Sequence, residues 1–295
     1  MKEFKHCNPI VNFMYFISVI VFSGVFLHPF SLIISLVCSF AYSVILNGKK
    51  AVKFNLLIVF PTMVGMAVLN PIFNHEGTTI LCYLPSNNPL TLESIANGVA
   101  VGMMTGSVIM WFSCYNAIVT SDKLMYLTGK LVPSLSLVIT MILRFVPIFI
   151  ARLKEISTAQ NGIGIKVNEG KILQRGKNGI RILSILVTWS LENAIETSQS
   201  MKSRGFGLKK RTSFSNIRFT KLDALLLFLI TVFVIYVIIG AATGRFKFLY
   251  YPKMSYIEWS CYSVSVFVSY FVLCIIPVIF EIVEDRKWKL LRSKI

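Results

Sequence analysis

The side chains that most often carry catalysis or bind metals are sparse in this sequence and do not cluster. The three histidines, His6, His28 and His75, stand alone, so no H-E-x-x-H or other metal-binding spacing occurs. There is also no G-x-x-x-x-G-K-[ST] phosphate-binding motif, no G-x-S-x-G nucleophile motif and no pair of carboxylates inside an apolar segment. We therefore expect a protein that is not an enzyme and that uses no cofactor and no metal ligand set.

The residues best suited to recognising a partner lie at the end of a predicted helix. Apolar side chains recur every three or four positions between residues 183 and 201, with Ala194 on the apolar face and Glu192 on the polar face, which indicates an amphipathic helix. Gly205 then supplies the residue type that ends helices in a left-handed conformation. Arg204 is thus held at a helix end, where a guanidinium can make a two-point contact with a carboxylate. Alternatively, Arg204 stabilises only its own helix dipole.

Composition indicates that this helix belongs to an integral membrane protein. Hydrophobic residues make up 55% of the 295 residues and the mean hydropathy is +0.69, against roughly 45–50% apolar residues in soluble domains. Apolar segments about as long as a bilayer is thick predict six spans, at about residues 10–27, 30–46, 54–69, 95–118, 222–241 and 256–282. We expect an all-α membrane fold.

The net charge of +17 fits the same interpretation. Cytoplasmic loops of membrane proteins collect Lys and Arg, and the sequence has no motif that reads RNA or DNA, so we expect a lipid bilayer and no nucleic acid as partner. Lys2 and Lys5 predict a cytoplasmic N-terminus, and five basic residues after position 285 predict a cytoplasmic C-terminus.

Residues 131–150 are apolar enough for a seventh span, but basic segments flank them on both sides. Residues 151–221 hold 14 of the 30 Lys and Arg, which predicts a cytoplasmic location. We therefore expect residues 131–160 to form a long helix along the inner membrane face, with Pro133 in its first turn and room for a kink at Pro147. Arg144 agrees, because it can reach water there. The alternative is a true span with a buried, paired Arg144.

These segments divide the chain into three parts. Residues 1–118 hold the first four predicted spans, residues 119–221 form a cytoplasmic-side domain of long amphipathic helices, and residues 222–295 hold the last two spans and a basic tail. In the fourth span, Gly98, Gly102 and Gly106 repeat the G-x-x-x-G spacing, which predicts close helix packing within this chain or against another.

Three sequence blocks in the middle of the chain occur in a fixed order. The first is Val119-Thr120-Ser121-Asp122-Lys123-Leu124 followed by Leu131-Val132-Pro133; the second is Leu143-Arg144-Phe145-Val146-Pro147 with Glu155, Ala159, Gln160 and Gly162; the third is Ser203-Arg204-Gly205-Phe206-Gly207 with Arg211-Thr212. Together they resemble the T component, or transmembrane coupling subunit, of energy-coupling factor transporters, which are vitamin and metal importers of bacterial plasma membranes. The resemblance covers about residues 119–223.

The resemblance implies the roles of these residues. It identifies the amphipathic segments as coupling helices that lie under a substrate-binding membrane protein, the S component, with Arg144, Pro147, Glu155, Ala159, Glu192 and Ala194 as their signature residues. It also implies that two short X-R-G motifs, one at the end of each helix, dock on two cytoplasmic ABC-type ATPase subunits. Ser203-Arg204-Gly205 matches this motif.

The first docking motif departs from the family pattern. In Gln160-Asn161-Gly162, Asn161 stands where the resemblance leads us to expect an arginine. We therefore expect either unequal docking of the two helix ends or compensation by Arg152 or Arg175.

Two other functions remain open. A conventional ABC permease would itself form the substrate path, but the sequence has neither its E-A-A coupling loop nor polar residues lining the spans. A membrane-embedded enzyme acting on lipid-linked substrates could use the basic segment 166–181 to bind phosphates, although no carboxylate or histidine cluster accompanies that segment.

Overall fold

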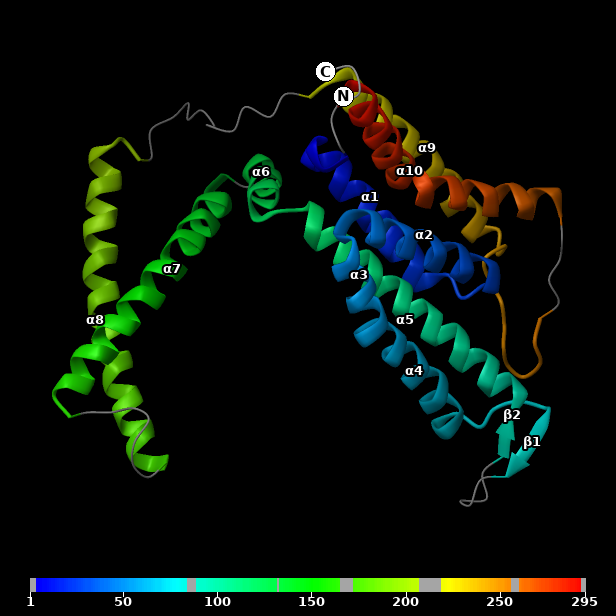
Figure 1. The fold of residues 1–295 in the computed structure, drawn as a ribbon, viewed down its shortest axis with the longest axis horizontal. Helices are drawn as coiled ribbons and strands as arrows, with labels where there is room; N and C mark the ends of the chain where they lie inside the picture. The colour runs from blue at the N-terminus through cyan, green and yellow to red at the C-terminus, as the bar shows by residue number, and fades with distance from the viewer. Residues whose placement is uncertain are drawn as a thin grey trace. The chain divides into compact units, whose positions relative to one another are not determined.

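The computed structural model describes residues 4–83, 89–131, 133–164, 172–206, 219–255 and 260–292. Helices dominate these residues, and one two-stranded ribbon accompanies them, which confirms the all-α membrane fold class (Figure 1). The chain divides into two compact units, one made of Met1–Leu124 with Ile217–Ile295 and the other of Met125–Asn216.

The first unit contains the apolar helices. They are α1 (Pro9–Val25), α2 (Pro29–Asn47), α3 (Lys49–Phe54) continued by the π-turn η2 (Asn55–Val59) and α4 (Phe60–Phe73), α5 (Leu92–Ile118), α9 (Lys221–Ala242) and α10 (Cys261–Arg292). In the described part of the chain, five helical segments are long and apolar enough to cross a membrane, while α1, with 17 residues, is shorter. Every predicted span thus falls on an apolar helix, and the number of crossings stays a prediction.

Local sequence signals explain where these helices begin. The Asn8 side chain accepts a hydrogen bond from the Ile10 amide, and Pro9 occupies the first turn of α1. Thr220 and Asp223 form a capping box at the start of α9. The buried Asp223 carboxylate also accepts a hydrogen bond from the Asn8 amide at 3.1 Å. One carboxylate therefore joins the starts of two helices that lie more than 200 residues apart.

Helix α5 lies against α4, α2 and α1 and forms the centre of this unit. The predicted glycine ladder faces α4. A Cβ atom added at Gly98 would lie 2.8 Å from the Ala67 carbonyl oxygen, and one added at Gly102 would lie 2.6 Å from the Met63 carbonyl oxygen. The glycine ladder therefore packs α5 closely against α4 within this chain, which is one of the two predicted alternatives.

Helix α2 packs on the face of α5 that points away from α4, and it presents four serines at a spacing of four residues. All four are buried, and they are Ser31, Ser35, Ser39 and Ser43. The Ser35 hydroxyl accepts from the Trp111 indole nitrogen of α5 at 3.1 Å and lies 2.6 Å from the Ser23 hydroxyl of α1. Small polar residues thus let α1, α2 and α5 approach closely and satisfy one another's hydrogen bonds.

The loop predicted between the third and fourth spans contains a small element that the sequence did not predict. Strands β1 (Ile80–Tyr83) and β2 (Pro89–Thr91) pair antiparallel, with Ile80 opposite Thr91. The buried Glu93, in the first turn of α5, accepts hydrogen bonds from the Thr78 hydroxyl and from the amide and hydroxyl of Thr79. This carboxylate ties the ribbon to the helix.

The second unit is simpler. Helix α6 (Ser121–Leu131) leads into it, and it consists mainly of α7 (Pro133–Gly162) and α8 (Ile172–Ser203). Both long helices were predicted, but α8 begins at Ile172, earlier than the periodicity from residue 183 suggested, and Gly176 and Gly179 are helical.

The glycine ladder gives a matched test of packing. Gly102→Ala places a methyl group against the α4 backbone, so we expect the free energy of unfolding to fall by about 1–3 kcal/mol. Gly65→Ala on α4 meets nothing within 4 Å and should leave stability unchanged or slightly higher. Thermal unfolding in detergent measures both variants, and an equal effect of the two would contradict the packing role of Gly102.

We predict that stability depends on pH through His28, which lies between α1 and α2. Its buried imidazole packs against Phe248 and Phe267, and this burial lowers the pKa of His28. The unfolded chain therefore binds more protons than the folded chain below pH ~6.5, so the stability present above this pH is lost as the pH falls. Between pH 7.5 and pH 5, melting temperature should fall further in the wild type than in His28→Phe; an identical fall would contradict this role.

Candidate functional site

The two long helices of the second unit cross one another, and their C-terminal ends lie apart in Figure 1. At the crossing, the Trp189 ring of α8 meets the Phe149 ring of α7 edge to face, with centroids 5.8 Å apart. Phe149 also stacks on Phe145, one turn earlier in α7. This aromatic contact joins the two helices. It was not predicted from the sequence, although two aromatic residues four apart on one helix are a signal of such a contact.

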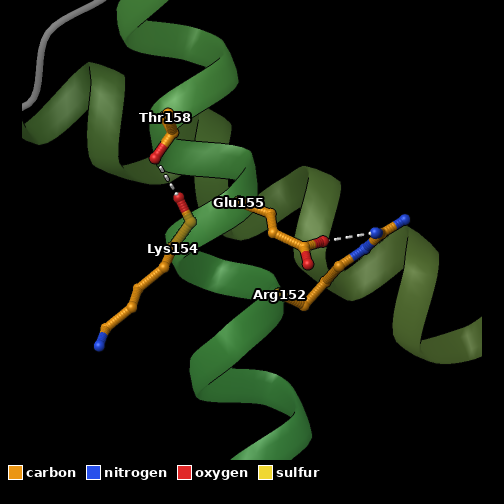
Figure 2. A network of polar contacts seen from close by, with 4 residues as sticks. All are labelled: Arg152, Lys154, Glu155 and Thr158. Atoms are coloured by element: carbon orange, nitrogen blue, oxygen red, sulfur yellow. Dashed lines mark hydrogen bonds and ion pairs between the residues drawn. The ribbon is translucent and has the colours of Figure 1, made fainter.

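Arg152 takes part in the same crossing. Its guanidinium lies 5.2 Å from the Trp189 ring centroid and 2.7 Å from a Glu155 carboxylate oxygen. Figure 2 shows this pair on α7, beside the hydrogen bond from the Thr158 hydroxyl to the Lys154 carbonyl. Arg152 lies 11 residues before Ile163, the residue that directly follows α7, which is roughly 16 Å along the helix axis. It is therefore engaged at the crossing rather than at the end of α7.

The end of α8 has the conformation that the sequence predicted. Gly205 is left-handed, with φ of 81°. Its amide donates to the Lys202 carbonyl at 3.0 Å, and the Phe206 amide donates to the Met201 carbonyl at 3.0 Å, which is the hydrogen-bond pattern of a Schellman motif. Arg204 is the cap residue of this motif. Its side chain is exposed, and no acidic side chain in the described residues forms an ion pair with it.

The end of α7 differs from the expected motif. Gly162 is the last helical residue, and the left-handed glycine is Gly164, with φ of 84°. Gln160 is half-buried, whereas Asn161 is exposed. The left-handed stop thus follows two residues after the glycine that the resemblance aligned with Gly205.

The remaining signature residues are spread along the two helices. Arg144, Ala159, Glu192 and Ala194 are exposed, and Pro147 lies inside α7. Within the described residues no acidic side chain pairs with Arg144, and no group of three or more His, Cys, Asp or Glu is placed to hold a metal ion. Val132, Gly207, Arg211 and Thr212 of the sequence blocks lie outside the described residues.

Both helices leave apolar side chains uncovered. On α7 the exposed residues at four-residue spacing are Val138, Ile142, Val146 and Ile150. On α8 they are Leu183, Val187, Leu191 and Ile195, the stripe that the sequence predicted. Contiguous exposed apolar stripes of this kind mark surfaces that contact a partner or a membrane.

The aromatic crossing predicts what holds the two helices together. Trp189→Ala removes an edge-to-face pair and a cation–π contact, together worth about 1–2 kcal/mol. We expect amide hydrogen exchange to speed up by roughly tenfold in α7 and α8 but not in α5. Thr188→Ala is the matched control, because the Thr188 hydroxyl bonds only within its own helix in the described contacts. Equal exchange rates in the two variants would contradict the role of Trp189.

Comparisons with known proteins agree with the sequence blocks and the helices. The family model of CbiQ, described as a cobalt transport protein, matches residues 3–214. The energy-coupling factor transporter transmembrane protein EcfT of Ruminiclostridium cellulolyticum is 25% identical over 208 residues, which cover 66% of this chain and 73% of that protein. EcfT of Lactobacillus helveticus is 38% identical over 93 residues, which cover 31% of this chain and only 34% of that protein.

The family match extends over most of the chain, including α1 to α8. The apolar helices of the first unit are those expected of a membrane transport protein. The chain therefore belongs to the CbiQ family of transport proteins, and its resemblance to the transmembrane component of energy-coupling factor transporters is confirmed.

Proposed function

We propose that this chain is the coupling subunit of an energy-coupling factor importer, linking two cytoplasmic ABC-type ATPase subunits to a membrane-embedded S component. The observation that carries the proposal is the pair of crossed helices, α7 and α8, with uncovered apolar stripes and with an exposed arginine at the end of α8. The chain hydrolyses no ATP itself; its ATPase partners do so, and the helices transmit their motion.

The end of α8 suits an ATPase partner. The Schellman motif already orders the backbone around Arg204, so docking on a carboxylate has to order only the arginine side chain. A planar guanidinium can make two parallel hydrogen bonds to that carboxylate, which a lysine ammonium reproduces poorly. Ser203-Arg204-Gly205 is the proposed docking segment on α8, and Gln160, Asn161 and Gly162 belong to the one on α7.

The apolar stripes suit the S component. Helices that lie at the membrane face need an apolar partner over their exposed Leu, Ile and Val side chains, and a small membrane protein offers such a surface. We assign Arg144, Pro147, Glu155, Ala159, Glu192 and Ala194 to these coupling helices. Movement of α7 and α8 as ATP is consumed would then reach the S component directly.

The proposed location is the bacterial plasma membrane, with both termini and residues 119–221 on the cytoplasmic side. The exposed lysines of α3, Lys49, Lys50 and Lys53, support this orientation, because basic loops remain in the cytoplasm. The cargo is proposed to be a vitamin or a transition-metal ion, selected by the S component rather than by this chain.

Membership in a transport family favours this proposal over a membrane enzyme acting on lipid-linked substrates. A conventional permease is the closer alternative. Purifying the tagged chain from native membranes separates them: two ABC ATPases with a small hydrophobic protein support coupling, whereas ATPases with an extracellular binding protein indicate a permease.

A charge reversal tests the docking role of α8. Arg204→Glu replaces the proposed docking cation with an anion, so we expect ATPase binding to weaken about tenfold or more and transport to be lost. Lys202→Glu makes the same charge change two residues earlier on the exposed helix end and should retain most binding. Co-purification of the ATPase subunits with each tagged variant from membranes measures the effect.

Membrane insertion and elution from a size-exclusion column should be unchanged in both variants, because neither side chain is buried. If Arg204→Glu assembles as well as the wild type, or if Lys202→Glu is equally damaging, the proposed contact of Arg204 is wrong.

A further inference from the structure

Helices α7 and α8 are both capped by a left-handed glycine, although the Ile163 amide donates to the Gln160 carbonyl, three residues earlier, and the Arg204 amide donates to the Ser200 carbonyl, four residues earlier. Gly164 and Gly205 are both left-handed, with φ of 84° and 81°. Each amide donates to the carbonyl three residues earlier, from Gly164 to Asn161 at 3.1 Å and from Gly205 to Lys202 at 3.0 Å. Because each glycine follows two residues after the last helical residue, the two ends can be aligned residue by residue.

This alignment puts Ile163 at the position that Arg204 holds in α8. The alignment also pairs Glu155 with Glu196, each nine residues before its left-handed glycine. Asn161, which the sequence blocks matched to the arginine position, instead aligns with Lys202. The cap geometry therefore gives α7 an isoleucine tip and α8 an arginine tip.

The isoleucine tip is open to a partner. Ile163 is 72% exposed. Gly162 and Gly164 stand on either side of it, and a Cβ atom added at either glycine would meet no described residue within 4 Å. These two glycines therefore leave both the Ile163 side chain and the backbone beside it accessible to a partner surface.

We propose that α7 docks on its ATPase subunit by inserting Ile163 into an apolar site, whereas α8 docks through Arg204 at an acidic site. This inference rests on the proposed function. A β-branched side chain has few rotamers at the first torsion, so Ile163 enters such a site with little loss of freedom. The two ATPase contacts then differ in chemistry: one excludes water from an apolar side chain, and the other pairs charges.

Substitutions at the end of α7 test the proposal with the full-length chain and its ATPase partners. The chain is purified in detergent, and its binding to the ABC ATPase subunits that co-purify with the wild type is measured as a dissociation constant. Ile163→Asp should weaken binding about tenfold or more, because it puts a charge into an apolar site. Ile163→Val, which keeps a β-branched apolar side chain, should remain within about threefold of the wild type.

Thr158→Asp is the matched control, because it introduces the same carboxylate five residues earlier, at an exposed position of α7 outside the proposed docking segment. It should bind like the wild type. Two outcomes would contradict docking of Ile163 in an apolar site: both aspartate variants weaken binding equally, or neither does while Arg204→Glu still weakens it. In either case the inference falls while the coupling function stands. If Arg204→Glu also binds normally, the proposed function falls as well.

Ionic strength gives a second measure. Raising salt from 0.05 M to 0.5 M screens charge pairs but not apolar contacts. The Ile163→Asp variant keeps only the ionic contact at α8, whereas Arg204→Glu keeps only the apolar contact at α7. Added salt should therefore weaken ATPase binding by a larger factor in Ile163→Asp than in Arg204→Glu. Equal salt dependence of the two variants would overturn the assignment of different chemistries to the two ends.

Discussion

The close approach of α4 and α5 sets the arrangement of the apolar unit. At Gly102 the backbone of α4 lies where a side chain would otherwise stand, so neither helix can shift without losing this contact. Helix α5, fixed on that side, presents Trp111 to the serines of α2, and its first turn holds Glu93 beneath the β-ribbon. Backbone proximity on one face thus leaves the other face of α5 available for hydrogen bonds that join α1 and α2.

The second unit depends on a different interaction. Helices α7 and α8 meet around Trp189, with Phe149 and Arg152 packed on its ring, while most of their apolar surface stays exposed. A soluble domain would bury such stripes in its own core. Two long helices fastened at one crossing can instead present two surfaces and two ends to other proteins, which is what a coupling element requires.

Periodicity and residue type predicted the elements but not their contacts. The stripe that includes Leu183 and Ile195, the left-handed stop at Gly205 and the close packing at Gly102 all follow from spacing, because each depends on a few neighbouring residues. The Asn8–Asp223 hydrogen bond joins residues too distant for spacing to reveal. The β-ribbon was missed because two short strands with a proline in one of them resemble an ordinary loop.

The end of α7 illustrates a subtler limit. Two glycines, Gly162 and Gly164, could each end the helix, and residue types alone do not say which adopts the left-handed conformation. The sequence blocks favoured Gly162, whereas the backbone selects Gly164 and thereby replaces Asn161 with Ile163 at the tip. A shift of two residues turns the tip by about 200° around the helix axis. It also changes the expected contact from a polar one to an apolar one, so a partner fitted to Arg204 would not fit both ends.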